Sequence, residues 1–287
     1  MKIGFIGTGI MGLPMAGHLL SAGHELQVYN RTAAKAQPLI DKGAISANTP
    51  AEAARGADIV ISIVSRTEDV LQVLTGDDGA AQAATPGCLF IDMSTIDSVA
   101  TEKLGKELNT MGIEFIDAPV SGGEGGAINA TLTIFCGGKA ENVERARPAL
   151  ECMGKKINHM GPCGAGQTAK ACNQILVAGA LLGVAEALAF GSKKGLDLHQ
   201  LIEATSGGSA KSWQLESIGK DIADGNFDPG FMAELMEKDL GMILAANPTD
   251  ENFPVTRATI ERLQKLMAQG DGKLGTQAVY QTFGSSK

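Results

Sequence analysis

The sequence predicts an α/β Rossmann domain followed by an all-α helical domain. Short apolar runs alternate with helical patterns over roughly the first 160 residues, which is typical of βαβ units and a mostly parallel sheet. From about Gly166 onward no convincing strand occurs, and helical patterns fill the chain. A Gly-Pro-Cys-Gly-Ala-Gly segment at residues 161–166 marks the change. We therefore expect one domain over residues 1–163 and a second over residues 164–287.

The predicted strands are short apolar runs in the first domain: Ile3–Ile6, Leu26–Tyr29, Ile59–Val64, Leu89–Ile91, Glu114–Ile116 and Leu132–Cys136. Helical patterns lie between them, at Met11–Ser21, Ala33–Lys42, Val70–Leu74 and Ser98–Met111. The second domain has such patterns at Gln167–Lys194, Leu198–Ala204, Ala233–Ala246 and Thr256–Met267. Its longest charge-free apolar stretch, 171–185, is shorter than the roughly 18 residues of a membrane span, so we expect a buried helix and no membrane.

Charge and composition exclude several classes of protein. The 287 residues carry 32 acidic and 24 basic side chains, and only 4% of them are aromatic, which argues against nucleic-acid binding. Five cysteines, an odd number without a Cys-x-x-Cys pair, and four scattered histidines predict neither a disulfide framework nor a metal site. The N-terminus starts with a strand-like run and has no signal-peptide pattern, so we expect a cytoplasmic protein.

A glycine-rich segment follows the first predicted strand and opens the first helix. Gly7-Thr8-Gly9-Ile10-Met11-Gly12 fits Gly-x-Gly-x-x-Gly. In that position glycines permit a tight turn and let the backbone approach a pyrophosphate at the helix N-terminus. We expect Gly7, Gly9, Ile10, Met11 and Gly12 to bind a dinucleotide; the alternative is an ordinary glycine-rich turn.

The residues at the end of the second predicted strand indicate whether the dinucleotide is NAD or NADP. An acidic residue there binds the ribose 2′-hydroxyl of NAD. This chain has Asn30, Arg31 and Thr32 instead, and the guanidinium suits a 2′-phosphate. These three residues are therefore predicted cofactor contacts, with NADP(H) preferred and NAD(H) as the alternative. Arg31 could also be a solvated loop charge.

Four further motifs carry a resemblance to a known family. They are Asp92-Met93-Ser94-Thr95, the run Asp117–Gly123, Gly161-x-x-Gly-x-Gly-x-x-x-Lys170-x-x-Asn173, and Lys238-Asp239-Leu240-Gly241. Together with the glycine-rich segment, these motifs resemble the β-hydroxyacid dehydrogenase family over essentially the whole chain. That family includes 3-hydroxyisobutyrate dehydrogenase, tartronate semialdehyde reductase and glyoxylate/succinic semialdehyde reductases.

The resemblance implies a catalytic lysine and a substrate site. Lys170 becomes the general acid/base, since a protonated lysine stabilises the oxygen that gains charge as hydride reaches a carbonyl. Asn173, three residues later on the same helix, is expected to orient the substrate or the lysine. Ser121, Gly122 and Gly123 resemble a site for the substrate carboxylate; without the family they indicate only a turn.

The resemblance also assigns cofactor contacts. It places Thr95 near the nicotinamide and makes Lys238 a contact from the helical domain; the alternative for Lys238 is a helix-surface cation paired with Glu234. Many relatives have Leu-Pro where this chain has Val64-Ser65, in a loop beside the cofactor, and Arg66 there has no assigned role.

These observations predict an NADPH-dependent reductase of a small carboxylated aldehyde, with the active site between the domains and the reverse oxidation available. The candidate aldehydes are tartronate semialdehyde, glyoxylate, succinic semialdehyde and methylmalonate semialdehyde. The alternatives are an NAD-dependent 3-hydroxyisobutyrate dehydrogenase and a catalytically silent NADP-binding sensor; imine reductases share the architecture but typically lack the lysine. The apolar helix of the second domain predicts a homodimer or homotetramer. The substrate, the choice between these two states and the direction of flux stay open, as does the location of Trp213, in a pocket wall or in the core.

Overall fold

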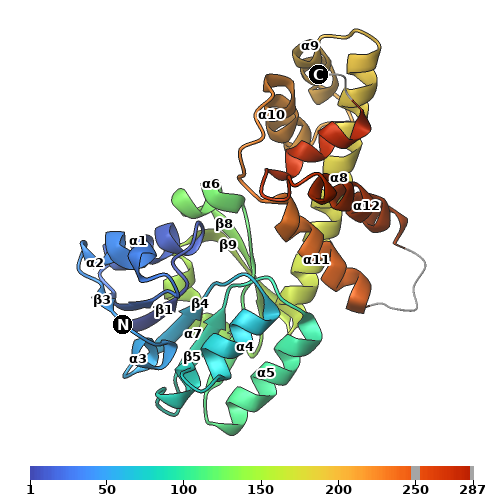
Figure 1. The fold of residues 1–287 in the computed structure, drawn as a ribbon. Coiled ribbons are helices and arrows are strands. Elements are labelled where there is room, and N and C mark those ends of the chain that lie inside the picture. The colour runs from blue at the N-terminus through green and yellow to red at the C-terminus, as the bar shows by residue number, and fades with distance from the viewer. Residues whose placement is uncertain (247–252, 285–287) are drawn as a thin grey trace. The chain divides into compact units, whose positions relative to one another are not determined.

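The computed structural model describes residues 1–246 and 253–284. The chain divides into two compact units, Met1–Lys170 and Ala171–Lys287 (Figure 1). Unit 1 is built around a sheet and unit 2 from helices, which confirms the predicted fold class.

The sheet of unit 1 has nine strands within the described residues, in the order β3-β2-β1-β4-β5-β6-β8-β7, with β9 paired to β8. The pairs from β3 through β6 are parallel, β8 is antiparallel to β6 and β7, and β9 is parallel to β8. Strands β2 and β4 flank β1 on opposite sides, so the strands that follow β1 are added first on one side of it and then on the other. Ligands of open α/β sheets bind at the point where the strand order reverses in this way. The strands are β1 Lys2–Ile6, β2 Glu25–Tyr29, β3 Ile45–Ser46, β4 Ile59–Ser62, β5 Leu89–Asp92, β6 Glu114–Asp117, β7 Val120–Ser121, β8 Leu132–Gly137 and β9 Gly154–Gly161.

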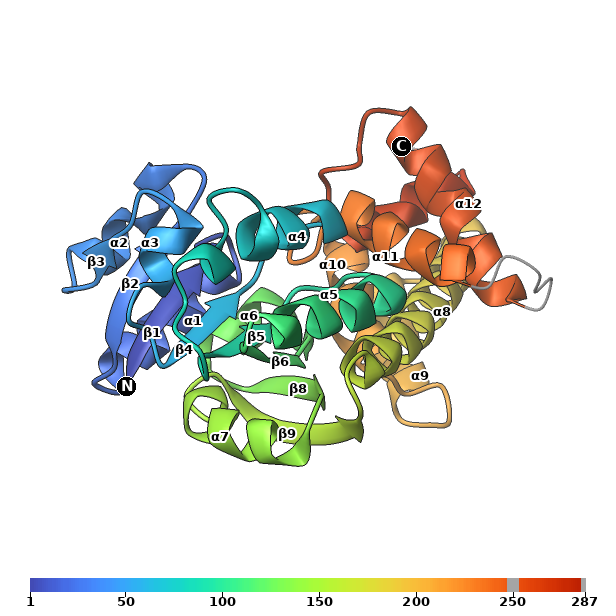
Figure 2. The same ribbon diagram turned by 90° about the horizontal axis from the view of Figure 1, so that it is seen from below.

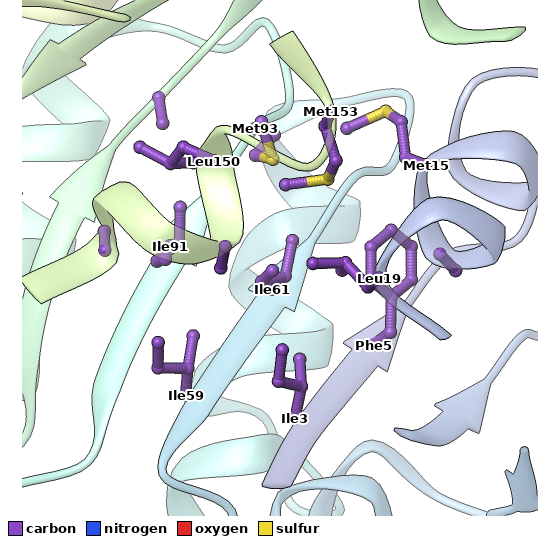
Figure 3. Close-up of a cluster of buried hydrophobic side chains, with 14 of the residues drawn as sticks. Ile3, Phe5, Met15, Leu19, Ile59, Ile61, Ile91, Met93, Leu150 and Met153 are labelled. Atoms are coloured by element: carbon purple, nitrogen blue, oxygen red, sulfur yellow. The ribbon is translucent and has the colours of Figure 1, made fainter. Parts of the chain in front are cut away.

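Helices cover both faces of this sheet. Side chains alternate between the faces along each strand, so Ile59 and Ile61 enter one core and Val60 enters the other. The first core includes Leu19 of α1 (Gly12–Ser21) and Leu150 of α7 (Ala140–Leu150), and Figure 3 shows it around β1 and β4. The second core is closed by α3 (Pro50–Ala54), α4 (Thr67–Thr75) and α5 (Ser98–Thr110). Figure 2 shows α7 beside β8 and β9.

Unit 2 has its own core. Helix α8 (Ala165–Lys193) begins in unit 1 and continues through unit 2. Leu181 of α8 packs in one cluster with Leu240 and Leu263 from the helices that follow. Those helices are α9 Leu198–Ser206, a π-helical turn Gln214–Ile218, α10 Gly219–Asp224, α11 Ala233–Ala246, α12 Pro254–Ala268 and a 3₁₀ segment Thr276–Phe283.

The local predictions needed corrections. All six predicted strands exist, but the third ends at Ser62 instead of Val64, and β3, β7 and β9 were missed. Strands β3 and β7 have only two residues each. Strand β9 lies at the edge of the sheet and is mostly exposed, and its sequence therefore has no apolar run. The predicted helix Ala33–Lys42 is a 3₁₀ turn, Ala33–Ala36, followed by the short α2, Gln37–Ile40. Pro38 has no N–H to donate, which is tolerated in the first turn of α2 but would cost a hydrogen bond in the interior of a longer helix. Two further short segments, a 3₁₀ turn Ala80–Gln82 and α6 Gly123–Ile128, complete unit 1.

Helix α8 is only partly buried. Its 29 residues include an 18-residue window of mean hydropathy 1.9, long and apolar enough to cross a membrane by length and composition, and 39% of that window is buried. Such windows also occur in the core helices of proteins that never enter a membrane. Leu176 and Phe190 on this helix are 74% and 65% exposed, so the helix is buried only in part and carries apolar surface outside the core.

Candidate active site

The strand register of unit 1 aligns the ends of five strands. Ile6 pairs with Tyr29 on one side and Ser62 on the other, Ser62 pairs with Asp92, and Asp92 pairs with Asp117. These parallel strands all end at one edge of the sheet, so the residues that follow them gather along that edge. The predicted residues of the glycine-rich segment, the Asn30 loop, Val64 and Thr95 all follow these strand ends.

Two glycines of the first loop have neighbours so close that no side chain would fit. Gly7 has φ +101°, and a side chain on it would overlap the carbonyl oxygen of Ile63. A side chain on Gly12 would overlap the carbonyl oxygen of Gly7. Gly9, in contrast, faces open space, because no atom lies within 4 Å of the place that a methyl group on it would occupy. The loop is therefore tightly folded against β4 and open at Gly9.

The same loop presents unused polar groups. The Thr8 hydroxyl is buried and has no hydrogen-bond partner. In the part of the chain that the structure describes, the N–H groups of Ile10 and Met11 donate to no backbone oxygen. They precede α1, where the helix dipole favours an anion. These groups, with the open space at Gly9, fit a dinucleotide pyrophosphate.

Asn30 joins this loop to the end of β2. Its Oδ1 accepts from the backbone N–H of Thr8 at 2.9 Å, and its Nδ2 donates to the Thr32 carbonyl oxygen at 2.9 Å. Arg31 is 86% exposed, and its Nη1 lies 3.5 Å from Oδ1 of Asp69 on α4. The guanidinium is thus accessible to an anion and is held on the side of α4.

A buried carboxylate connects the ends of β4 and β5. Asp92 Oδ1 accepts from the hydroxyls of Ser62 and Ser94, both at 2.7 Å, while its Oδ2 has no partner. Burial raises the pKa of Asp92 to about 6, although the serine hydrogen bonds act in the opposite direction. Ser94 Oγ also accepts from the Val64 N–H at 2.9 Å. Arg66, exposed just before α4, remains without an assigned role.

A second buried carboxylate, Asp117 at the end of β6, binds the N-terminus of α8. Its Oδ1 accepts from the Gly164 N–H at 2.8 Å and its Oδ2 from the Gln167 N–H at 2.9 Å. Burial raises the pKa of Asp117 and these N–H donors lower it, with burial the larger effect. Because N–H donors face both oxygens, the ionised form fits the hydrogen bonds.

Lys170 lies in the second turn of α8 and is buried, with 7% of its surface exposed. Asn173 lies three residues further along the helix, as predicted. Lysine is rarely this buried unless it is paired, and the roles of Lys170 and Asn173 stay predictions that rest on the family resemblance.

In unit 2 a polar network surrounds Asp239. Asn173 Nδ2 donates to Gln174 Oε1 at 2.9 Å, and Gln174 Nε2 donates to Asp239 Oδ2 at 2.7 Å. The Nζ of Lys238 lies 3.0 Å from Asp239 Oδ1, and the Lys238 side chain is 20% exposed. The network therefore joins two predicted site residues, Asn173 and Lys238, through a carboxylate that is 3% exposed.

The predicted carboxylate site has a distinct backbone. Ser121 lies in β7, paired with Thr133 of β8. Gly122 and Gly123 follow with φ +135° and +60°, values that favour glycine. This backbone opens α6 and leaves Ser121 half-buried.

Sequence reasoning missed several residues of these networks: Gln167, Gln174 and Asp239. Residue spacing also gave no sign of the distant partners of the two strand-end aspartates: Asp92 accepts from Ser62 on β4 in addition to its neighbour Ser94, and Asp117 accepts from the start of α8. Trp213 is 65% exposed, so core packing was the wrong alternative for it. In residues 1–246 and 253–284, no group of three His, Cys, Asp or Glu side chains could hold a metal ion, and the five cysteines are free.

Comparison with known proteins gives matches over the whole chain. Residues 2–161 match the family model for the NAD binding domain of 6-phosphogluconate dehydrogenase, and residues 164–283 match the model for the NAD-binding domain of NADP-dependent 3-hydroxyisobutyrate dehydrogenase. The chain is 40% identical to 2-hydroxy-3-oxopropionate reductase of Escherichia coli, over 99% of this chain and 97% of that protein. It is 38% identical to an NAD-dependent L-serine dehydrogenase of Pseudomonas aeruginosa, over 98% and 97% of the two chains.

A solved structure agrees with these sequence matches. The 3-hydroxyisobutyrate dehydrogenase of Mycobacterium tuberculosis, solved with L-serine, superimposes with a TM-score of 0.89 at 33% identity and covers 99% of both chains.

Proposed function

This chain belongs to the β-hydroxyacid dehydrogenase family, and we propose that it reduces a small carboxylated aldehyde to the hydroxyacid with NADPH, in a reversible reaction. Membership makes it an NAD(P)-dependent oxidoreductase acting on CH–OH groups and disfavours a silent NADP-binding sensor. The substrate class and the preference for NADPH are what we propose beyond family membership. The main observation in support of the reductase activity is the buried Lys170 on α8.

Lys170 is proposed as the general acid/base. When bound, the cofactor supplies the hydride that reaches the carbonyl carbon. The Lys170 ammonium stabilises the negative charge that develops on the carbonyl oxygen and donates its proton from Nζ to that oxygen. In the oxidative direction the neutral amine accepts the hydroxyl proton. Asn173 is proposed to orient the substrate.

The segment Ser121-Gly122-Gly123 is proposed to bind the substrate carboxylate. The serine hydroxyl can donate to one carboxylate oxygen, and the absence of side chains at the two glycines lets backbone N–H groups approach the other. An anion site of this kind selects carboxylated aldehydes over neutral ones. Tartronate semialdehyde, glyoxylate, succinic semialdehyde and methylmalonate semialdehyde all meet this requirement.

The proposed preference for NADP(H) rests on Arg31. Its exposed guanidinium can bind a 2′-phosphate through charge-assisted hydrogen bonds, beside Asn30 and Thr32. Gly7, Gly9, Ile10, Met11 and Gly12 are proposed to bind the pyrophosphate, and Val64, Thr95 and Lys238 to contact the rest of the cofactor. The second candidate is an NAD-dependent enzyme of the 3-hydroxyisobutyrate dehydrogenase type, which the name of the Pseudomonas relative favours.

We also propose a homodimer or homotetramer in the cytoplasm, without membrane attachment. Leu176 and Phe190 are 14 positions apart on α8, close to four helical turns, and therefore lie on one face. A second copy that covers this face would remove their apolar surface from water. Sedimentation at micromolar concentration tests this; a single 29.6 kDa species would contradict it.

The function is tested by following NADPH absorbance with the four aldehydes, with NADH in parallel. We expect rapid NADPH oxidation with one aldehyde and slower oxidation of NADH. Oxidation of NADH alone would contradict the role of Arg31 and favour the second candidate. An absence of turnover with all four aldehydes and both cofactors would contradict the proposed substrate class.

A further inference from the structure

The start of α8 is fixed to the sheet of unit 1 by a carboxylate from a distant part of the chain. Asp117 precedes its hydrogen-bond donors, Gly164 and Gln167, by 47 and 50 positions. Most helix caps are supplied by the residue just before the helix. Here the end of β6 supplies the cap, so the bonds set the position of the helix relative to the strand ends.

Two glycines make this contact close. A side chain on Gly137, at the end of β8, would overlap Asp117 Oδ1, and a methyl carbon on Gly166 would lie 2.7 Å from Asp117 Oδ2. The first turn of α8 therefore lies directly against the carboxylate, with no side chain between them.

Gln167 supplies a second attachment from the same turn. Its Nε2 donates to the Ser94 carbonyl oxygen at 2.8 Å, and its Oε1 accepts from the Ile96 N–H at 3.1 Å. These bonds are buried and reach the loop that carries Thr95. The first turn of α8 is thus joined to the ends of both β5 and β6.

Lys170 follows Gln167 by three residues, about 4.5 Å further along the helix axis. The backbone position of Lys170 is consequently set by the turn that Asp117 and Gln167 hold. Proton transfer needs the donor within hydrogen-bond reach of the reacting oxygen, and a misplacement of about 1 Å can cost about 100-fold in rate.

We propose that Asp117 is a positioning residue for Lys170: its carboxylate fixes the first turn of α8 and thereby the place at which Nζ of Lys170 meets the carbonyl oxygen. Asp117 acts without touching substrate or cofactor. This inference rests on the proposed function, because it takes Lys170 as the proton donor.

Asp117→Asn tests the proposal. The amide keeps one oxygen acceptor, but its NH₂ group faces an N–H donor, so one of the two bonds is lost at nearly constant volume. We expect kcat for the fastest aldehyde of the four-member panel to fall about 10- to 100-fold. KM for that aldehyde and the NADPH dissociation constant should stay within threefold, because ground-state binding is not affected.

Asp197→Asn is the matched control. Asp197 caps α9 through a 2.8 Å bond from the Gln200 N–H, and α9 carries no proposed site residue. Asparagine keeps an oxygen acceptor for this bond, so this variant should leave kcat unchanged. If Asp117→Asn also leaves kcat within twofold of wild type, Asp117 is merely a structural cap and the inference is overturned.

Two further variants keep the result interpretable. If Asp117→Asn does not yield folded protein, Gln167→Ala serves in its place, because it removes the second attachment without changing any charge. The same selective fall in kcat is expected for Gln167→Ala. An unchanged kcat overturns the inference. Lys170→Ala tests the premise separately. Retained activity in Lys170→Ala would contradict the proposed function, whatever the Asp117 variant does.

Discussion

Arg31, directly after β2, and Asp69 of α4 form an ion pair in which Nη1 lies 3.5 Å from Oδ1. The pair joins the loop that is proposed to select the cofactor to a helix on the second face of the sheet. A bound 2′-phosphate and the Asp69 carboxylate would compete for the same guanidinium.

Arg31→Ala should therefore weaken NADPH binding about 10- to 100-fold, which corresponds to the 1.5–3 kcal/mol typical of hydrogen bonds to charged groups. NADH, which has no 2′-phosphate, should bind equally well to variant and wild type. Fluorescence titration with both cofactors measures this. Equal losses for NADPH and NADH would show that Arg31 does not read the 2′-phosphate.

Asp69→Asn tests the competition from the other side. Removal of the carboxylate frees the guanidinium, so NADPH affinity should rise by a few fold, and the gain should shrink at high salt because the charges are exposed. Glu68→Gln is the control, since it removes an exposed charge from the same helix. A loss of NADPH affinity in Asp69→Asn would mean instead that Asp69 holds Arg31 in its binding position.

Gly9→Ala and Gly12→Ala should have different effects. A methyl group at Gly9 meets no protein atom within 4 Å, so the variant should melt like wild type yet lose NADPH affinity at least about tenfold, because the methyl occupies space that the pyrophosphate needs. At Gly12 the methyl would overlap the Gly7 carbonyl oxygen, so stability should fall as well. Calorimetric melting and NADPH titration separate the two.

Gly17→Ala, on the same helix, provides the reference for these variants. Its nearest neighbour, Leu39 Cδ2, lies at 3.9 Å, so alanine fits and should stabilise α1 by up to about 1 kcal/mol. NADPH affinity should not change. Unchanged NADPH binding in Gly9→Ala would contradict the proposed pyrophosphate site.

Lys170→Ala should lower kcat about 10²- to 10⁴-fold, the usual contribution of general acid–base catalysis. NADPH binding should change by less than threefold, because Lys170 is proposed to act on the substrate oxygen. Single-turnover kinetics with saturating NADPH measures the chemical step. Lys193→Ala, near the other end of α8, should retain wild-type kcat.

Asp92→Asn should change how stability depends on pH. Burial raises the pKa of Asp92 from 3.8 to about 6, so the folded state binds this proton more tightly than the unfolded state does. The contribution of Asp92 to stability is therefore most favourable below pH 3.8 and is lost as the pH rises to about 6.

The asparagine variant carries no charge, so its unfolding free energy relative to wild type should increase by about 2 kcal/mol between pH 4 and 6.5, which is most of the energy that a shift of about two pKa units corresponds to. Urea denaturation at a series of pH values measures the difference. The exposed Asp77→Asn provides the comparison. Parallel pH curves for wild type and Asp92→Asn would show that Asp92 is ionised in both states alike.

The fold class was predictable because its signals are local. Strands such as β1 and β4 are buried on both faces and therefore read as continuous apolar runs, and the glycine loop follows β1 directly. Strand β9 gave no such signal. Its residues are mostly exposed, it pairs only with β8, and its polar sequence Lys-Lys-Ile-Asn-His does not differ from that of a loop.

The polar networks were unpredictable for another reason. Asp117 stands before Ala-Pro, a pattern that predicts a turn, and its partners come from α8 far along the chain. Asp239 follows Lys238 directly, and neighbours in a helix point in different directions, so sequence spacing does not predict their ion pair. Such partners become visible only once the strands and helices are assembled.

The attachment of the first turn of α8 to unit 1 also bears on where this chain can be joined to part of a relative. Unit 1 ends at Lys170, several residues beyond the sequence boundary at 163/164, and includes the donors that satisfy Asp117. After a crossover at residue 163, the N–H donors that face Asp117 would come from the helix start of another chain, whereas a crossover after residue 170 would preserve every one of these bonds. The proposed catalytic lysine is thus inherited with the nucleotide-binding half, and an exchange of the helical half could alter substrate range while leaving the proton donor in place.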